Sequence, residues 1–155
     1  MTVSPHAFAT RSIHAGASPH AATGARAMPI FHTNGFAFED LDHGSDIFAL
    51  KRAGFSYSRG SNPNLAALEA RVASLEEGAA AVACASGQSA LLIALLALCA
   101  MGDELVSADA LFGGSLTLLQ RMEQRFGIKT RWADPFDASA IEAAITPTCR
   151  LAWPR

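Results

Sequence analysis

The chain has 155 residues, enough for one domain, with 50% hydrophobic, 17% charged and 8% aromatic residues. Its formal net charge is −2 and its pI is near 6.2. This composition is typical of a domain with a hydrophobic core and excludes a disordered chain. It offers no basic surface for nucleic acid or an anionic membrane. The wide spacing of Cys84, Cys99 and Cys149 excludes a disulfide framework and a zinc ligand set.

Residues 1–6 have no basic segment followed by an apolar core, so we predict no signal peptide. The longest apolar run, near residues 90–101, is shorter than the roughly 18–20 residues of a membrane span. We therefore expect a cytoplasmic protein that has neither a membrane nor a nucleic-acid partner.

Residues 1–61 show little hydrophobic periodicity and carry all five histidines. The segment is too polar and broken to form a core, yet too apolar to remain solvated. We predict an N-terminal arm over residues 1–61 that contacts a partner subunit, followed by a separate domain at residues 62–155. The histidine spacings do not indicate a metal site, and the acidic residues 39–42 are interpreted as a solvated turn.

From Asn62 onward the pattern is regular. Asn62 and Pro63 predict the start of a helix that ends at Gly78. Further helices are expected to end near Met101, at Gly127 after Phe126, and near Ile145, and Asp137 is expected to cap the last of them. Apolar runs predict strands at residues 79–85, 104–108, 128–133 and from 149. Helices alternating with strands over short connections predict an α/β protein with three layers, in which helices cover both faces of a mostly parallel sheet.

The turn at Ser86, Gly87 and Gln88 follows the first predicted strand and opens a helix. Ligands of open α/β sheets bind beyond the carboxyl ends of strands, and a helix N-terminus favours an anion. A phosphate cradle is one interpretation, and a turn without ligand is the other. The sequence excludes a Walker loop, a dinucleotide motif and a nucleophile elbow.

Two more segments carry groups suited to a ligand. Phe112 lies beside a Gly-Gly pair at the end of the second predicted strand, and its ring can stack on a planar ligand ring. Arg59 follows the only tyrosine, Tyr57, by two residues, and its guanidinium can make a bidentate contact with phosphate. Taken locally, a core phenylalanine and a polar loop before a helix cap are the simpler interpretations.

The order of these segments is specific. Tyr-Ser-Arg precedes Asn-Pro and Leu-Glu-Glu-Gly, and Ser-Gly-Gln, Gly-Asp and Phe-Gly-Gly follow. This order, from about Phe8 to Ala152, resembles the Cys/Met-metabolism family of enzymes that depend on pyridoxal 5′-phosphate (PLP). Residues 10–16 and 22–30 look most like O-acetylhomoserine sulfhydrylases. The resemblance implies a truncated aspartate-aminotransferase-like fold, type I of the PLP-dependent transferases.

The resemblance also implies the cofactor contacts. Ser86, Gly87 and Gln88 match the turn that holds the PLP phosphate, and Tyr57 and Arg59 match a pair that reaches the phosphate of a neighbouring subunit.

Three departures from the family pattern stand out. Phe112 matches a ring-stacking aromatic that is usually tyrosine, so it keeps the stacking face and lacks the hydroxyl. Asn64 replaces the threonine of Asn-Pro-Thr, and Asn34 and Phe36 alter a patch usually rich in Thr, Ser and Tyr.

The family's Schiff-base lysine and the aspartate that pairs with the pyridine nitrogen are expected beyond Arg155. Neither Lys51 nor Lys129 matches the lysine by position, so we assign no catalytic residue and expect this chain alone to be inactive.

By resemblance, we expect a transferase or lyase of sulfur amino-acid metabolism that acts as a homotetramer, a dimer of dimers. It would carry out γ-replacement on O-acetylhomoserine with sulfide or methanethiol, giving homocysteine or methionine. The alternatives are a cystathionine γ-synthase, a methionine γ-lyase, a non-catalytic remnant or interaction module, and an unrelated nucleotide-binding domain.

Overall fold

The computed structural model describes residues 6–153. Residues 1–5, which include most of the stretch used to exclude a signal peptide, and residues 154–155 lie outside the described part. Internal contacts divide the chain into two compact units, Met1–Ala83 and Cys84–Arg155. The helix predicted from Pro63 therefore groups with the N-terminal residues. The predicted contact of residues 1–61 with a partner subunit stays a prediction.

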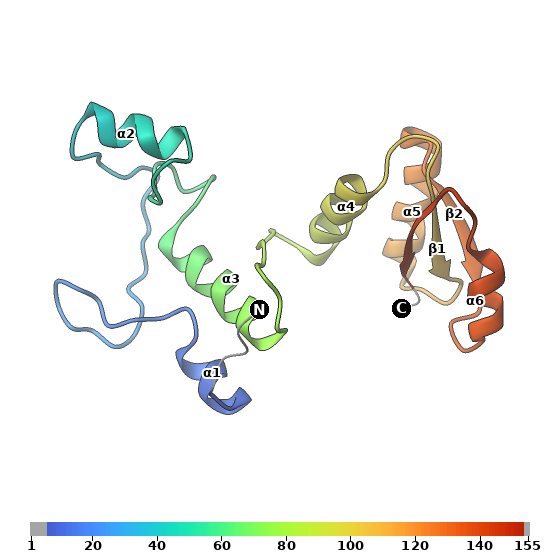
Figure 1. Cartoon of the computed structure of the whole chain (residues 1–155), viewed down its shortest axis with the longest axis horizontal. Helices are drawn as coiled ribbons and strands as arrows, with labels where there is room; N and C mark the ends of the chain where they lie inside the picture. The colour runs from blue at the N-terminus through green and yellow to red at the C-terminus, as the bar shows by residue number, and fades with distance from the viewer. Residues whose placement is uncertain (1–5, 154–155) are drawn as a thin grey trace. The chain divides into compact units, whose positions relative to one another are not determined.

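Helices and strands alternate only in the second unit (Figure 1). The first unit has the helices α1 (Phe8–His14), α2 (Leu41–Phe48) and α3 (Pro63–Leu75). The second unit has α4 (Gly87–Leu98), β1 (Glu104–Ala108), α5 (Gly113–Phe126), β2 (Lys129–Ala133), α6 (Ala138–Ala144) and β3 (Cys149–Trp153). None of the helices over residues 6–153 combines the length and apolar character that crossing a membrane requires.

The sheet of the second unit is parallel, with the strand order β2-β1-β3. The chain moves across the sheet in one direction from β1 to β2 and in the opposite direction from β2 to β3. Right-handed crossovers therefore place α5 and α6 on opposite faces, and Figure 1 shows these helices on either side of the sheet. The predicted α/β class with a parallel sheet between helices is confirmed.

The core of the second unit gathers residues from α4, β1 and α5. Leu95 and Leu119 are fully buried and pack in one cluster with Leu105, Met122 and Ile128. Burial of such side chains is the main stabilising term of the unit. The chain leaves α5 through Gly127, whose left-handed φ of 67° lets its N–H bond to the last helical carbonyls, as the sequence predicts.

The strand predicted at residues 79–85 is wrong. This segment has no assigned strand, and Val82 within it is 78% exposed. A strand exists only where a neighbouring strand accepts and donates its backbone hydrogen bonds. The apolar run indicates a preference for burial, but the described residues offer this segment no ladder partner.

The start of α3 is as predicted, and its end is not. The Asn62 side chain accepts a hydrogen bond from the backbone N–H of Asn64 at 2.9 Å, and Pro63 is the first helical residue. The left-handed position after the helix belongs to Glu77, with φ of 55°, while the N–H of Gly78 bonds to the carbonyl of Ala73 at 2.9 Å. This is a Schellman-type ending shifted one residue toward the N-terminus.

The helices α1 and α2 lie where no periodicity was recognised. The turn expected at residues 39–42 instead begins α2, because Asp40 acts as its N-cap and accepts from the N–H of His43 at 2.7 Å. Both helices are short, so their apolar pattern spans too few turns to be distinguished from a loop.

We expect Glu77→Gly to raise the free energy of unfolding by about 0.5–1 kcal/mol, because glycine adopts a positive φ without steric cost. The substitution also removes the ion pair between Glu77 and Arg11, 3.8 Å apart, in which Glu77 is 64% exposed. Such a pair contributes little. Urea denaturation of the 155-residue chain measures the effect. Glu77→Ala is the control, since it removes the same carboxylate and keeps the strained Cβ. Equal stability of both variants would contradict the prediction.

Candidate functional site

The turn before α4 is built on Ser86. Its backbone is extended, with φ of −158° and ψ of 159°, and its Oγ accepts from the N–H of Ser89 at 3.1 Å. Its carbonyl accepts from the N–H of Ala90 at 3.0 Å. Ser86 is therefore the N-cap of α4, and the helix begins at Gly87.

The first turn of α4 leaves donors available to a ligand. The N–H groups of Gly87 and Gln88 have no hydrogen-bond partner within residues 6–153. A Cβ built on Gly87 would meet no atom within 4 Å, so the space beside the turn is open. Free N–H groups at the positive end of a helix dipole bind oxyanions. The geometry fits a phosphate group.

The chain after β1 lies against the same turn. Gln88 Nε2 donates to Oγ of Ser115 at 3.2 Å, and Ser115 is buried. A Cβ built on Gly114 would lie 2.7 Å from Cε1 of Phe112 and 3.5 Å from Nε2 of Gln88. Gly114 therefore lies close to both side chains, and the ring of Phe112 is 77% exposed. The structure brings Ser86, Gly87, Gln88 and Phe112 together at the carboxyl end of β1, which fits a planar ring that carries a phosphate.

The other predicted contacts lie in the first unit. The guanidinium carbon of Arg59 is 5.7 Å from the centre of the Tyr57 ring, and Tyr57 forms an isolated antiparallel bridge with Gly35. Tyr57 is half exposed. The structure thus pairs Tyr57 with Arg59. Their contact with the phosphate of a neighbouring subunit stays a prediction.

The structural roles of two side chains, Ser115 and Asn64, were not predicted from the sequence. Ser115, which orients Gln88, had only one signal, a hydroxyl residue directly after the Gly-Gly pair. Asn64 was interpreted only as the loss of a threonine hydroxyl. Its side chain donates to the carbonyl of Pro29 at 2.7 Å and accepts from the N–H of Phe31 at 2.8 Å. Asn64 therefore ties the N-terminal segment to the start of α3.

Lys129 and Lys51 lie apart from the predicted contacts. Lys129 begins β2, at the amino end of the parallel strands, whereas Phe112 follows the carboxyl end of β1. Lys51 belongs to the first unit, is 73% exposed and lies 4.0 Å from a carboxylate oxygen of Asp46. Within residues 6–153, no group of three or more His, Cys, Asp or Glu side chains is placed to hold a metal ion.

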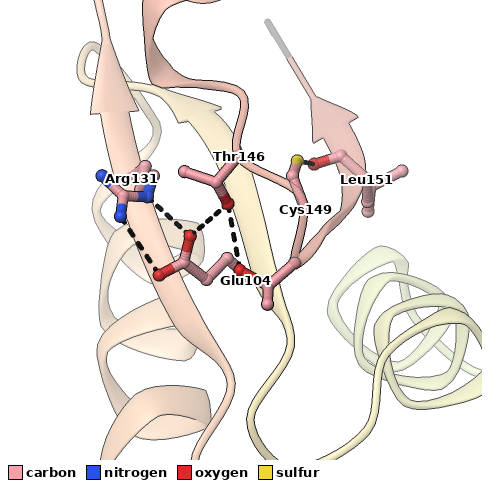
Figure 2. Close-up of polar contacts among 6 residues, drawn as sticks. Glu104, Arg131, Thr146, Cys149 and Leu151 are labelled. Carbon is pink, nitrogen blue, oxygen red and sulfur yellow. Dashed lines mark hydrogen bonds and ion pairs between the residues drawn. The ribbon is translucent and has the colours of Figure 1, made fainter.

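The amino end of the sheet carries a polar network (Figure 2). Glu104, the first residue of β1, accepts from Nε of Arg131 on β2 at 2.7 Å and from the hydroxyl of Thr146 at 2.6 Å. The Arg131 and Thr146 hydrogen bonds lower the pKa of Glu104 from 4.5 to about 2. This network joins β1, β2 and the segment before β3, and it lies at the opposite end of the strands from Phe112.

Comparisons with known proteins agree with this geometry. The model of the family described as "Cys/Met metabolism PLP-dependent enzyme" matches residues 9–154. The chain is 43% identical over 153 residues to homocysteine synthase of Schizosaccharomyces pombe, covering 99% of this chain and 36% of that protein. It is 43% identical to O-acetyl-L-homoserine sulfhydrylase of Corynebacterium glutamicum (92% of this chain, 33% of that one). It is 42% identical to L-methionine gamma-lyase of Pseudomonas putida (94% and 37%).

Solved structures show the same fold. An O-acetylhomoserine (thiol)-lyase from Campylobacter jejuni, whose crystal structure contains a pyridoxyl-lysine phosphate, superposes with a TM-score of 0.87 at 30% identity. The match covers 95% of this chain and 36% of that one. Cystathionine gamma-lyase from Lactobacillus plantarum gives a TM-score of 0.82 at 34% identity, covering 95% and 36%. The fold is that of the PLP-dependent trans-sulfuration enzymes.

The chain spans about a third of the length of the curated relatives it matches. The match with the family model nevertheless covers nearly all of its residues and includes the turn before α4 and the Phe-Gly-Gly segment. The chain therefore belongs to the Cys/Met metabolism family of PLP-dependent enzymes, whose cofactor is pyridoxal 5′-phosphate.

Proposed function

We propose that this chain forms the phosphate- and ring-binding part of an enzyme that exchanges the γ-substituent of O-acetylhomoserine for sulfide or methanethiol. The products would be homocysteine or methionine. One observation carries the proposal: the open N-terminus of α4, whose first N–H groups are unpaired within residues 6–153, lies beside an exposed aromatic ring. The names of two of the relatives, homocysteine synthase and O-acetyl-L-homoserine sulfhydrylase, support the substrate class.

The residues present fit the cofactor. The N–H groups of Gly87 and Gln88, with the hydroxyl of Ser86, would bind the phosphate, and Phe112 would stack on the pyridine ring. Tyr57 and Arg59 would reach the phosphate of a neighbouring subunit. When bound, PLP supplies an electron sink for negative charge that develops on the amino-acid substrate. The chain's own contribution is to bind and orient that group.

Phe112 contributes packing and no proton transfer, because its ring carries no hydroxyl. Phe112 is 77% exposed, and its ring would cover one face of a bound pyridine ring and exclude water there. No proton-transfer role is proposed for any residue of this chain. A cytoplasmic location, and the dimer-of-dimers assembly that the resemblance implies, are part of this proposal.

The substrate is tested with a chimera. The chain is joined to the carboxyl-terminal remainder of the Corynebacterium glutamicum relative, and the native relative is the control. We expect homocysteine from O-acetylhomoserine and sulfide. A methionine γ-lyase is the second candidate, because the Pseudomonas putida relative is 42% identical. It predicts release of methanethiol from methionine instead. A chimera that folds, binds PLP and catalyses neither reaction would contradict the proposed activity and favour a non-catalytic module.

Cofactor binding by the chain itself is a separate prediction. Pyridoxamine 5′-phosphate is the probe, since its amine cannot form a Schiff base with Lys51 or Lys129. We expect Ser86→Ala to weaken binding roughly tenfold, because one phosphate contact and the N-cap are lost. Calorimetric titration measures the affinity. Thr117→Ala, an exposed hydroxyl residue on α5, is the control, and pyridoxamine without phosphate should bind far more weakly. Equal affinity for both compounds would show that the phosphate cradle is not used.

A further inference from the structure

We infer that the first unit contains a second anion-binding site, which takes a small organic dianion such as a dicarboxylate. The site is a cavity of about 600 Å³ lined by residues of α1, α3 and the segment between them. Its polar side chains include His14, Arg26 and Arg71, and Ile13 and Met28 contribute apolar walls. A volume of this size is within the range of cavities that hold small molecules.

The charge of the cavity is unbalanced. Arg26 and Arg71 line it, and no aspartate or glutamate is among its lining residues. Arg26 makes no hydrogen bond or ion pair within the described part of the chain, and Arg71 makes no ion pair there. His14 adds a hydrogen-bond donor even in its neutral form. Two guanidinium groups without a counter-charge favour an anion with two acidic groups.

Arg71 is held in position before any ligand arrives. Its Nε donates to the carbonyl of Ala15 at 2.9 Å, which is the one hydrogen bond of its side chain within residues 6–153. The other N–H donors of the guanidinium therefore remain available. The contact depends on Gly16, because a Cβ there would lie 2.3 Å from the carbonyl oxygen of Ala67. Gly16, at φ of +72°, lets the turn after α1 approach α3 closely enough to orient Arg71.

The neighbouring Arg11 shows the contrast. One of its Nη groups donates to the carbonyl of Ser74 at the end of α3, and the other lies 3.8 Å from Glu77. The charge of Arg11 is thus offset within the protein and serves the helix terminus. Among the described residues 6–153, the charges of Arg26 and Arg71 have no such internal partner, so we assign these two side chains to a ligand.

The test uses succinate as the dianion and succinamide as its neutral analogue. The ¹⁵N-labelled 155-residue chain is titrated, and shifts are followed at the amides of residues 13–28 and at Nε of Arg71. We expect succinate to shift these signals and succinamide to leave them unchanged. Arg26→Gln should weaken succinate binding roughly tenfold, since one charge-assisted contact is lost. Because Arg26 is exposed and has no described partner, we expect this variant to retain the fold. Arg71→Lys keeps the positive charge and loses the bidentate guanidinium, so it should weaken succinate binding several-fold.

The control is Arg52→Gln, an exposed arginine of the same unit that lies 3.7 Å from Glu39. It should leave the succinate response unchanged. Equal effects of Arg26→Gln and Arg52→Gln, or equal responses to succinate and succinamide, would overturn the inference. Shifts confined to residues 86–89 would also overturn it, because succinate would then bind at the α4 turn. Ser86→Ala should change only the response to pyridoxamine 5′-phosphate, so failure of the cofactor proposal leaves this test intact.

Discussion

Glu104→Gln is expected to lower the melting temperature at neutral pH by roughly 5–10 °C, because it breaks a partly enclosed charge pair at the amino end of the central strand β1. The carboxylate accepts from Nε of Arg131 at 2.7 Å and from Nη2 at 3.2 Å, a bidentate contact that an amide cannot reproduce. It also accepts from the hydroxyl of Thr146 at 2.6 Å. Glu104 is 9% exposed, so water replaces these partners poorly. Differential scanning calorimetry measures the change.

The same carboxylate makes stability depend on pH. Its pKa falls from 4.5 to about 2 in the folded chain, so the folded state favours the ionised form. The stabilisation is fully present above pH 4.5 and is lost as the pH falls through about 2. The difference in melting temperature between the native chain and Glu104→Gln should therefore shrink over this window.

A matched control separates Glu104 from other acidic groups. Hydrogen bonds also lower the pKa values of Asp103 and Asp137, so the native chain loses stability in acid for several reasons. Glu123→Gln, on the exposed side of α5, should give a melting temperature close to that of the native chain at every pH. If the native chain and Glu104→Gln lost stability in parallel from about pH 6 to about pH 2.5, the assignment to Glu104 would be wrong.

Leu119→Ala is the second large effect, with an expected loss of about 3–5 kcal/mol in the free energy of unfolding. Leu119 lies on α5, is fully buried and packs in one core cluster with Leu95 and Leu105. Truncation removes apolar contacts and leaves a cavity that close-packed neighbours fill only in part. Urea denaturation followed by circular dichroism measures the loss.

The neighbouring position on α5 provides the control. Gln120→Ala changes an exposed residue of the same helix to a good helix former, so its effect should stay within about 0.5 kcal/mol. A loss below about 1 kcal/mol for Leu119→Ala would show that α5 does not pack on the core as described.

Helix ends were predictable where the responsible groups are neighbours in sequence. Asp137 was expected to cap a short helix, and its side chain accepts from the N–H groups of Ser139 and Ala140. The left-handed Gly127 was predictable for the same reason, because its N–H bonds to carbonyls four and five residues earlier. At α3 the local rule missed by one residue, because Glu77 and not Gly78 occupies the left-handed position after the helix.

The candidate site was predictable in its parts and not in its assembly. Ser86, Gly87 and Gln88 form a recognisable strand-to-helix turn, and Phe112 precedes a Gly-Gly pair. The hydrogen bond that joins the two segments is between Gln88 and Ser115, which are 27 positions apart. No sequence rule predicts which hydroxyl group will accept a hydrogen bond from a glutamine that is this far away in the chain.

The sequence by itself determined the order of helices and strands after residue 86, the caps at Gly127 and Asp137, and the family of the chain. These features follow from apolar periodicity, short-range hydrogen bonds and motif order, all of which are local. The sequence placed the end of α4 near Met101, whereas the helix ends at Leu98. The tertiary structure alone decided that residues 79–85 have no strand partner and that Glu104 joins Arg131 to Thr146. It also decided that Gly16 brings Ala15 to Arg71. Each of these features depends on which distant segments become neighbours in the fold. Hydrogen bonds and burial require groups to be close in space, and sequence spacing does not specify that for distant segments.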